Sequence, residues 1–382
     1  MKVLCVFGTR PEAIKMAPVI KALSQSNKIK LKVCVTGQHK EMLYQVLDIF
    51  NIRPDFDLSL MSKNQTLNSL MSRIIAAVDP VLESESPDWV LVHGDTTTST
   101  AAALAAFHRK IRIAHVEAGL RTHDLTQPWP EEMNRRVTDS ISEMLFPPTL
   151  KAKKNLLDEG LGDRKIAVTG NTVIDALIYT SNKLKEDKDL SHSIRQMLPP
   201  MSLDRRVLLV TGHRRENFGR GFEEVCRALV NLSQRKDIHI IYPVHLNPNV
   251  KGIVGDMLAN IDNIDLIDPL DYLPFVWLMQ NSYVVLTDSG GVQEEAPSLG
   301  KPVLVMRDVT ERPEAVEAGT VKLVGTATQN IVQSVNNLYD DIDLYRKFAF
   351  AINPYGDGQA SERIVAALEG KTFTEFVAKT EL

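Results

Sequence analysis

The sequence predicts an α/β protein with two domains, each built on a parallel sheet, and three observations support this. The chain has 382 residues, which exceeds the size at which a single hydrophobic core usually stops growing. Short β-branched apolar runs alternate with longer helical patterns along the whole length. The runs are apolar throughout, as expected for strands buried on both faces of a parallel sheet.

The expected elements follow this alternation in order. In the first half we expect strands at 3–7, 31–36, 89–93, 112–116 and 166–169. The segments between them that have a helical pattern are 13–23, 41–50, 67–81 and 98–109. In the second half we expect strands at 207–211, 238–244, 264–267, 283–287, 302–306 and 321–324.

A polar, charged patch at 183–204 separates the two series and contains Pro199-Pro200. It is interpreted as a domain boundary, although a surface excursion after a long helix fits the same pattern. We therefore expect one Rossmann-like domain over 1–182 and another over 183–360. The last segment, 361–382, has a helical pattern over 361–380 and is expected to return to the first domain.

Composition excludes several function classes. The net charge of -4 and the pI near 6.2 argue against a nucleic-acid binder, which usually carries a basic excess. No stretch approaches the roughly 18 apolar residues that a membrane span needs, and the apolar N-terminal run is too short for a signal peptide. We expect a cytoplasmic protein without a nucleic-acid or membrane partner.

The three cysteines, Cys5, Cys34 and Cys226, lie far apart and form no C-x-x-C motif. They are expected to be inert core thiols rather than a disulfide or a metal site. The chain also lacks a P-loop, a G-x-G-x-x-G after the first strand and an H-E-x-x-H motif. These absences argue against a kinase, an ATPase or a classical dehydrogenase, and no metal or other cofactor is expected.

The two halves share a short motif after their first strands. Gly8-Thr9-Arg10 follows the first run, and Gly212-His213-Arg214 follows the run that opens the second half. In open α/β sheets, ligands bind outside the carboxyl ends of the strands. Two such edges facing each other would form an interdomain cleft, with Arg10 on one wall and His213 on the other.

A candidate phosphate site lies in the second half. Ser289, Gly290 and Gly291 stand between an expected strand and an expected helix, where backbone N–H groups and the helix dipole favour an anion. Glu295 follows about one turn later, where it would accept hydrogen bonds from the hydroxyls of a ribose. Arg312 lies just beyond the next strand. A tight turn capped by Ser289 is the simpler alternative, but the combination favours a nucleoside diphosphate.

Three carboxylates in the first half are candidates for acid/base chemistry. Asp95 and Glu117 follow two expected strands, and Glu131 begins a helix after Pro130. Each has a structural alternative: Asp95 as a helix N-cap, and Glu131 as a favourable charge at a helix start. Convergence at one sheet edge favours a shared acid/base site, in which partial burial is expected to raise some of the pKa values toward working pH.

Basic side chains near the same edge complete the candidate site. Arg10 and Lys15 begin the first helix and would neutralise a leaving phosphate, with Arg10 favoured because its guanidinium forms bidentate pairs. A solvated helix position is the alternative for Lys15. His213 is the histidine expected to contact the diphosphate, whereas His93 and His115 are expected to satisfy hydrogen bonds in the core.

These residues closely resemble the motifs of the non-hydrolysing UDP-N-acetylglucosamine 2-epimerases of bacterial surface-polysaccharide pathways. The resemblance covers nearly the whole chain. It runs through Phe7-Gly8-Thr9-Arg10-Pro11-Glu12, His93-Gly94-Asp95-Thr96, His115-Val116-Glu117-Ala118-Gly119-Leu120-Arg121, Pro130-Glu131-Glu132, Thr211-Gly212-His213-Arg214-Arg215-Glu216, Asp288-Ser289-Gly290-Gly291, Arg312-Pro313-Glu314 and Asn353-Pro354-Tyr355-Gly356-Asp357-Gly358.

The resemblance implies a GT-B fold and the interconversion of UDP-GlcNAc and UDP-ManNAc without metal or nicotinamide. It implies elimination of UDP to a 2-acetamidoglucal intermediate and re-addition with the opposite configuration at C2. The product would supply ManNAc precursors for cell-surface polysaccharide, and relatives are usually homodimers.

The resemblance also implies roles for individual residues. Asp95, Glu117 and Glu131 form the acid/base set, in which the residue that takes the C2 proton stays open. Arg10, His213 and Lys15 would stabilise UDP, and Ser289, Gly290, Gly291 and Glu295 would hold its diphosphate and ribose, with Arg312 on the substrate. Leu270 and Phe275 fall where the family embraces uracil, although Leu270 replaces an expected Gln. Gln38, Gln65 and His245 match an allosteric UDP-GlcNAc site, from which Glu41 and Asn64 depart.

Three other functions share part of this pattern. A GT-B glycosyltransferase would have a similar donor site, a hydrolysing epimerase would release free ManNAc, and a sensor would bind a UDP-sugar without turnover. Three acidic groups around one sugar favour epimerisation over transfer. Retention of every acid/base candidate argues against a sensor.

Overall fold

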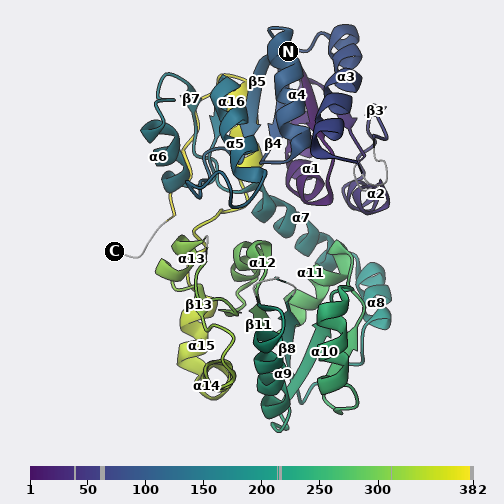
Figure 1. The fold of residues 1–382 in the computed structure, drawn as a ribbon, viewed down its shortest axis with the longest axis vertical. Helices are drawn as coiled ribbons and strands as arrows, with labels where there is room; N and C mark the ends of the chain where they lie inside the picture. The colour runs from purple at the N-terminus through teal and green to yellow at the C-terminus, as the bar shows by residue number, and fades with distance from the viewer. Residues whose placement is uncertain (38–39, 61–64, 213, 215–216, 311, 379–382) are drawn as a thin grey trace. The chain divides into compact units, whose positions relative to one another are not determined.

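The computed structural model describes residues 1–37, 40–60, 65–212, 214, 217–310 and 312–378, which form two compact units (Figure 1). The first unit comprises Met1–Ala176 and Tyr355–Ala378, and the second comprises Leu177–Pro354. These limits lie a few residues before the boundaries expected at 182/183 and 360/361. The assignment of 1–182 and 183–360 as functional domains stays a prediction.

The first unit is built on a seven-stranded sheet in which every strand pair is parallel, in the order β3-β2-β1-β4-β5-β6-β7. Its strands are β1 (Lys2–Phe7), β2 (Lys30–Val35), β3 (Phe56–Asp57), β4 (Trp89–His93), β5 (Arg112–Val116), β6 (Met144–Phe146) and β7 (Lys165–Ile166). Its helices are α1 (Arg10–Ser24), α2 (Lys40–Ile49), α3 (Leu67–Glu85), α4 (Thr97–His108), α5 (Glu131–Ile141), α6 (Leu150–Asp158) and α16 (Ala360–Leu368). The helix α7 (Thr172–Glu186) runs across the limit between the units.

The start of α1 shows how local sequence places the first loop. Thr9 caps the helix through Glu12 N–H, while Glu12 accepts from the backbone N–H groups of Gly8 at 3.0 Å and Thr9 at 2.8 Å. Glu12 also accepts from Thr96 Oγ1 at 2.7 Å, so the loops after β1 and β4 are joined. The strand order reverses between these two strands, which is where open α/β sheets bind ligands.

The second unit contains a six-stranded parallel sheet in the order β10-β9-β8-β11-β12-β13. Its strands are β8 (Arg206–Thr211), β9 (Ile238–Pro243), β10 (Ile264–Ile267), β11 (Val284–Thr287), β12 (Val303–Val305) and β13 (Val321–Leu323). Its helices are α8 (Lys188–Met197), α9 (Arg220–Leu232), α10 (Pro248–Leu258), α11 (Tyr272–Asn281), α12 (Gly290–Glu295), α13 (Pro313–Glu317), α14 (Thr328–Asp340) and α15 (Ile342–Ala349), and a 3-10 turn spans Ala296–Leu299. This sheet reverses between β8 and β11.

Most expected strands are present within a residue or two of their expected ends, and the structure differs from the expectation in three places. The strands β3 and β6 were not expected, because two or three residues carry no recognisable periodicity. The strand expected at 166–169 ends at Ile166. The polar patch at 183–204 is the end of α7 followed by α8, whose described residues belong to the second unit.

The helix expected over 361–380 is shorter than the pattern indicated. α16 ends at Leu368, and Gly370 follows with φ of 70°, a conformation that favours glycine at a helix end. Phe376 N–H then donates to Val168 O at 2.9 Å, so the chain continues alongside the segment after β7. The return of this segment is seen in the packing of α16 against α1, and Figure 1 shows α16 among the elements of the first unit.

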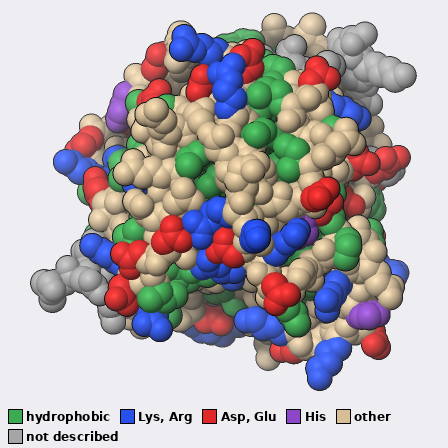
Figure 2. All heavy atoms as spheres, turned by 90° about the horizontal axis from the view of Figure 1, so that it is seen from below, with side chains coloured by type: hydrophobic (Ala, Val, Ile, Leu, Met, Phe, Trp, Pro, Cys, Tyr) green, Lys and Arg blue, Asp and Glu red, His purple; other side chains and the backbone are tan. Residues whose placement is uncertain are grey.

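The described residues have the buried core and the charged surface that are usual for a globular protein. Cys5, Cys34 and Cys226 are buried and form no disulfide. Figure 2 shows acidic and basic side chains interspersed on the face that it displays. Among the described residues, no helix is both long enough and apolar enough to cross a bilayer.

Candidate active site

The first unit brings the predicted acid/base and basic residues to one edge of its sheet. Arg10 and Lys15 lie on α1 directly after β1, Asp95 follows β4 and Glu117 follows β5. These three strands are neighbours in the sheet, in the order β1-β4-β5. The candidate site therefore lies at the switch point of the sheet. The sequence predicted an edge formed by strand ends but not the strand order that makes it a switch point.

Glu117 is the most enclosed of the three carboxylates. Its backbone has φ of 66°, an uncommon conformation for a residue other than glycine, and its side chain is buried. Oε2 forms an ion pair with Lys15 Nζ and accepts from Asn171 Nδ2 at 3.0 Å. His93 Nε2 lies 3.8 Å from the same oxygen. Lys15 is thus engaged with a carboxylate rather than solvated on its helix.

Glu117 is not among the carboxylates to which the expectation of a raised pKa applies. Burial does raise its pKa, but the ammonium of Lys15, with His93 and Arg135 nearby, outweighs burial and lowers the pKa to about 2. The carboxylate is therefore ionised at neutral pH. A carboxylate in this state accepts a proton rather than donating one, which suits a base.

Asp95 is held by α5. Its Oδ2 forms an ion pair with Arg135 Nη2, and its backbone oxygen accepts from Asn134 Nδ2 at 3.0 Å. The N-cap of α4 is Thr96, whose hydroxyl accepts from Ser99 N–H at 3.1 Å. The structural alternative for Asp95, an N-cap, is therefore not what the structure contains.

Glu131 opens α5 four residues before Arg135, so the two side chains lie on the same face of the helix. Its Oε2 is buried and has no hydrogen-bond partner in the described part of the chain. The neighbouring Glu132 instead accepts from the backbone N–H groups of Thr122 at 3.1 Å and His123 at 3.2 Å. Glu132 thus has a structural role, whereas Glu131 has a buried oxygen to which no described residue donates.

The two histidines near strand ends, His93 and His115, differ in their hydrogen bonding. His115 fulfils the expectation of a satisfied core histidine: Nδ1 lies 2.7 Å from Asp139 Oδ1 and Nε2 lies 2.7 Å from Gly94 O. Both ring nitrogens of His115 therefore have a polar partner. For His93 the expectation is wrong, because neither ring nitrogen has a hydrogen-bond partner among the described residues. Burial lowers the pKa of His93 to about 3, which keeps this ring neutral.

Arg10 is half-buried at the start of α1 and forms no hydrogen bond or ion pair with the described residues. Its guanidinium is available for a ligand at this edge. His213, the predicted diphosphate contact of the second half, lies outside the described residues, as does Gln38.

The predicted phosphate site of the second unit stands at the other switch point. Ser289 occupies the N-cap position of α12 after β11, but its side chain forms no capping hydrogen bond. A Cβ built on Gly290 would lie 2.6 Å from Arg312 Nη1, so only glycine lets this guanidinium approach the helix start. Arg312 Nε donates to Glu294 Oε1 at 2.6 Å. Glycine at 290 therefore brings a cation and backbone N–H groups together.

The remaining predicted ligand contacts surround this turn. Glu295 is buried and its Oε1 accepts from Tyr272 Oη at 3.2 Å, while Oε2 lies 3.7 Å from the Cβ position of Gly291. Leu270 precedes α11, and Phe275 lies in its first turns; both are partly buried. Contact of these two residues with uracil stays a prediction.

The predicted allosteric residues are not gathered within one unit. Gln65 lies in the first unit, where its Oε1 accepts from Arg73 Nη1 at 3.2 Å. His245 lies in the second unit, is exposed and accepts from Asn247 N–H at 3.1 Å. The allosteric role of these residues stays a prediction.

Two contributors were missed from the sequence. Arg135 pairs with Asp95, and its position four residues after Glu131 is a signal that helix periodicity could have provided. Asn171 contacts Glu117 from 54 residues away, and no sequence pattern links the two. Within the described residues, no group of three or more His, Cys, Asp or Glu side chains is placed to hold a metal ion.

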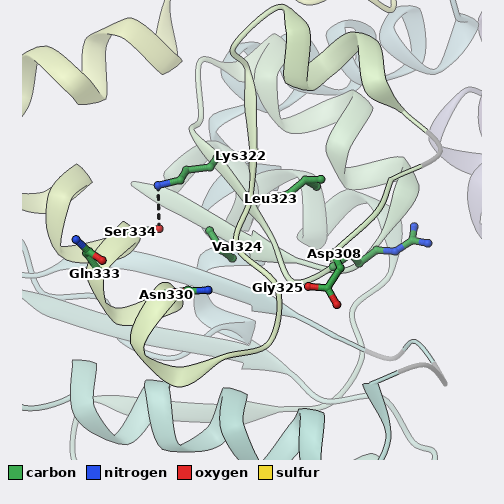
Figure 3. Close-up of a pocket in the computed structure, with 9 residues that line it drawn as sticks. Asp308, Lys322, Leu323, Val324, Gly325, Asn330, Gln333 and Ser334 are labelled. Carbon is green, nitrogen blue, oxygen red and sulfur yellow. Dashed lines mark hydrogen bonds between the residues drawn. The ribbon is translucent and has the colours of Figure 1, made fainter.

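A polar pocket in the second unit contains none of the predicted site residues. Its volume is about 350 Å³, and Asp308, Lys322 and Ser334 are among its lining residues (Figure 3). Lys322 Nζ donates to Ser334 Oγ at 3.2 Å across the pocket, between β13 and α14. The pocket is therefore distinct from the turn at Gly290.

Comparison with known proteins agrees with this geometry. The model of the family described as UDP-N-acetylglucosamine 2-epimerase matches residues 21–369. The UDP-N-acetylglucosamine 2-epimerase of Escherichia coli K12 is 55% identical over 370 residues, which are 97% of this chain and 98% of that protein. The chain belongs to the UDP-N-acetylglucosamine 2-epimerase family.

Other relatives support the same conclusion. A probable UDP-N-acetylglucosamine 2-epimerase of Ralstonia nicotianae is 56% identical and covers 96% of this chain and 98% of its own. The crystal structure of the Neisseria meningitidis enzyme bound to UDP-GlcNAc has 52% identity and a TM-score of 0.89, covering 97% of this chain and all of that one. With the two parallel sheets, this likeness confirms the predicted GT-B fold. The roles of individual residues stay predictions.

Proposed function

We propose that the protein interconverts UDP-GlcNAc and UDP-ManNAc by inverting C2 of the sugar. The observation that carries the proposal is the placement of Asp95 and Glu117 after the neighbouring strands β4 and β5, with Glu131 on α5, the helix whose Arg135 pairs with Asp95. Family membership supports the same reaction, because relatives over 50% identical across nearly the whole chain carry that activity in their names.

The reaction requires more than one carboxylate. No carbonyl lies next to C2 to acidify its proton, so a base removes the proton as the C1–O bond to UDP breaks. The C2–H electron pair becomes the C1=C2 double bond of 2-acetamidoglucal, and the diphosphate leaves with the C1–O pair. UDP then adds back to C1 while an acid delivers a proton to the other face of C2.

The three carboxylates suit this division of tasks because their surroundings differ. Glu117 is ionised beside Lys15, Asp95 is paired with Arg135, and Glu131 keeps a buried oxygen without a described partner. Groups in different environments can take acid and base roles at one pH. The residue that removes the C2 proton stays open.

We assign nucleotide binding to basic side chains and to the glycine turn before α12. Arg10 and Lys15 at the first switch point would stabilise the charge that develops on the leaving diphosphate. We assign the turn at Gly290, with Arg312 against it, to the diphosphate and Glu295 to the ribose. The Neisseria relative was crystallised with UDP-GlcNAc, which supports this ligand.

Exchange of the C2 proton in heavy water tests the proposal. The protein is incubated with UDP-GlcNAc in D₂O, and C2 is followed by NMR. We expect deuterium at C2 of both UDP-sugars and a mixture of the two. Free ManNAc as the product would indicate a hydrolysing enzyme, and turnover only after addition of an acceptor would indicate a transferase.

Asp95→Asn tests the acid/base assignment. We expect turnover to fall by about 10²- to 10⁴-fold while UDP still binds, because the variant keeps the size of the side chain and loses its charge. Asp163→Asn is the matched control, since the Asp163 side chain is 71% exposed. Near-normal turnover in the Asp95 variant would remove this residue from the set.

Several finer expectations remain proposals of the same kind. A cytoplasmic location follows from the apolar pattern of the sequence. A homodimer, a role in cell-surface polysaccharide and activation by UDP-GlcNAc follow from the family resemblance. Activation by UDP-GlcNAc would appear as a sigmoidal dependence of the rate on substrate concentration.

A further inference from the structure

Asn171 is a buried amide that touches the candidate acid/base site without belonging to the predicted set. Its side chain is 3% exposed, and Nδ2 donates to Glu117 Oε2 at 3.0 Å. It follows Gly170 and precedes α7. An amide that donates to a reactive carboxylate can fix the orientation of that carboxylate.

The backbone around Asn171 is held from two sides. Its own N–H donates to Tyr355 O at 2.7 Å, and its Oδ1 accepts from Val173 N–H at 3.0 Å at the start of α7. A Cβ on Gly170 would lie 3.4 Å from Gly356 Cα, and one on Gly356 would lie 3.0 Å from Ile174 Cγ1. The segment around Tyr355, which the proposed function leaves without a role, therefore supports Asn171 directly.

The donors around Glu117 all face the same oxygen. Lys15 of α1 and Asn171 contact Oε2, and His93 of β4 lies 3.8 Å from it. Arg135 of α5 adds positive charge nearby. No described residue forms a hydrogen bond to Oε1. A carboxylate whose one oxygen is occupied by donors exchanges a proton at the other.

We propose that Asn171 is a positioning residue that fixes Glu117 through Oε2 and thereby presents Oε1 to the sugar for proton exchange. The proposal rests on the proposed epimerase function. Asn171 acts through Glu117 and not on the ligand, so its loss changes turnover more than substrate affinity. It also acts on the ionisation of Glu117, since a donor favours the charged form.

Asn171→Asp separates this role from a structural one. Asp keeps the acceptor that caps α7, because Asp and Asn are about equally good N-caps. It removes the Nδ2 donor and places a second negative charge against Oε2. Like charges in contact raise the pKa of a carboxyl, so the acidic limb of kcat/KM against pH moves upward by about 1 unit or more. We expect kcat to fall about 10²-fold with KM within about threefold, because Glu117 loses its orientation.

Asn171→Ser and Thr172→Val complete the experiment. Ser keeps a capping oxygen but lacks a donor that reaches Glu117, so we expect a loss of kcat with a smaller movement of the acidic limb. Thr172 is the neighbouring buried residue, and its hydroxyl has no hydrogen-bond partner among the described residues. Thr172→Val alters the same segment without touching Glu117 and is expected to keep the wild-type pH profile.

The assay is the conversion of UDP-GlcNAc to UDP-ManNAc from pH 2 to 9 in short incubations, with circular dichroism at each pH as a check on folding. The proposal is overturned if the acidic limb of kcat/KM against pH stays at its wild-type position in both Asn171 variants. It is also overturned if Thr172→Val moves this limb as far as the Asn171 variants do. If Asn171→Asp fails to fold, Asn171→Ser against Thr172→Val decides the question. Absence of conversion by the wild-type protein refutes the proposed function instead.

Discussion

Asp139 is the buried carboxylate that joins the loops of the candidate site, and its replacement tests the packing beneath them. It is fully buried on α5 and accepts from His115 Nδ1 at 2.7 Å, Gly119 N at 3.1 Å and Arg121 Nη2 at 2.7 Å. Through His115 it also reaches Gly94 O, next to Asp95. One side chain thus supports the loops after both β4 and β5.

Asp139→Ala removes all three acceptor contacts and leaves the buried charge of Arg121 with Glu159 alone. Breaking a buried ion pair by removing one partner costs about 3–5 kcal/mol. For a unit of this size, 1 kcal/mol lowers Tm by about 2–4 °C, so we expect a fall of roughly 10 °C at neutral pH.

Asp139→Asn is expected to be milder, for a reason visible in the geometry. The amide NH₂ can donate to a neutral His115 at Nδ1, whose Nε2–H still donates to Gly94 O. The amide oxygen can then accept from Gly119 and Arg121. Every contact is kept while the carboxylate charge is lost, and we expect a cost of about 1–2 kcal/mol.

Differential scanning calorimetry measures both variants, with Asp163→Ala as the exposed control. The pH dependence adds a second test. Burial raises the pKa of Asp139, but His115 and Arg121 outweigh it and lower the pKa below its ordinary value. Its stabilisation is therefore present above the ordinary carboxyl pKa and is lost as the pH falls through the lower native value. A cost below about 1 kcal/mol for Ala, or equal costs for Ala and Asn, would refute this reasoning.

Three further predictions follow from single contacts. A Cβ on Gly8 would lie 2.0 Å from Thr36 Oγ1, so Gly8→Ala is expected to cost about 1–3 kcal/mol by overpacking, as measured by urea unfolding. Lys15→Met removes the ammonium that lowers the pKa of Glu117, so the acidic limb of the activity profile is expected to move to higher pH. Glu295→Ala is expected to weaken UDP binding by about tenfold or more in calorimetry, through loss of a charged acceptor for the ribose.

Each of these predictions has a contrasting outcome. Gly255→Ala is the control for Gly8→Ala, since a Cβ there meets nothing within 4 Å, and equal stabilities for the two variants would contradict the packing argument. An unchanged acidic limb in Lys15→Met would mean that Glu117 does not control that limb. Unchanged UDP affinity in Glu295→Ala would remove this residue from the nucleotide site.

The sheets were predictable because apolar runs identify buried strands, and β4, β5 and β10 have the expected ends. The switch points depend on the order of the strands in each sheet, and the sequence does not give this order. Residues at strand ends could nevertheless be identified without knowing the order. Asp95 and Glu117 were found in this way. The short strands β3 and β6 lacked any periodic signal.

Side-chain partners were harder to predict because they depend on packing between distant segments. His93 and His115 occupy equivalent places in the sequence, two residues before a carboxylate, but Asp139 lies beside only one of them. The sequence predicted raised pKa values for some of the three carboxylates but could not say which, and at Glu117 the ammonium of Lys15, 102 residues away, reverses the effect of burial on the pKa. Local sequence indicated burial and gave no sign of this ion pair.

The exchange of the C2 proton tests the central claim most directly. The wild-type protein is incubated with UDP-GlcNAc in D₂O, and both UDP-sugars are isolated and examined by NMR. The account predicts deuterium at C2 in UDP-GlcNAc and UDP-ManNAc, without any acceptor and without free ManNAc. Retention of the original hydrogen at C2 in both sugars, or conversion to a single product without exchange, would contradict it.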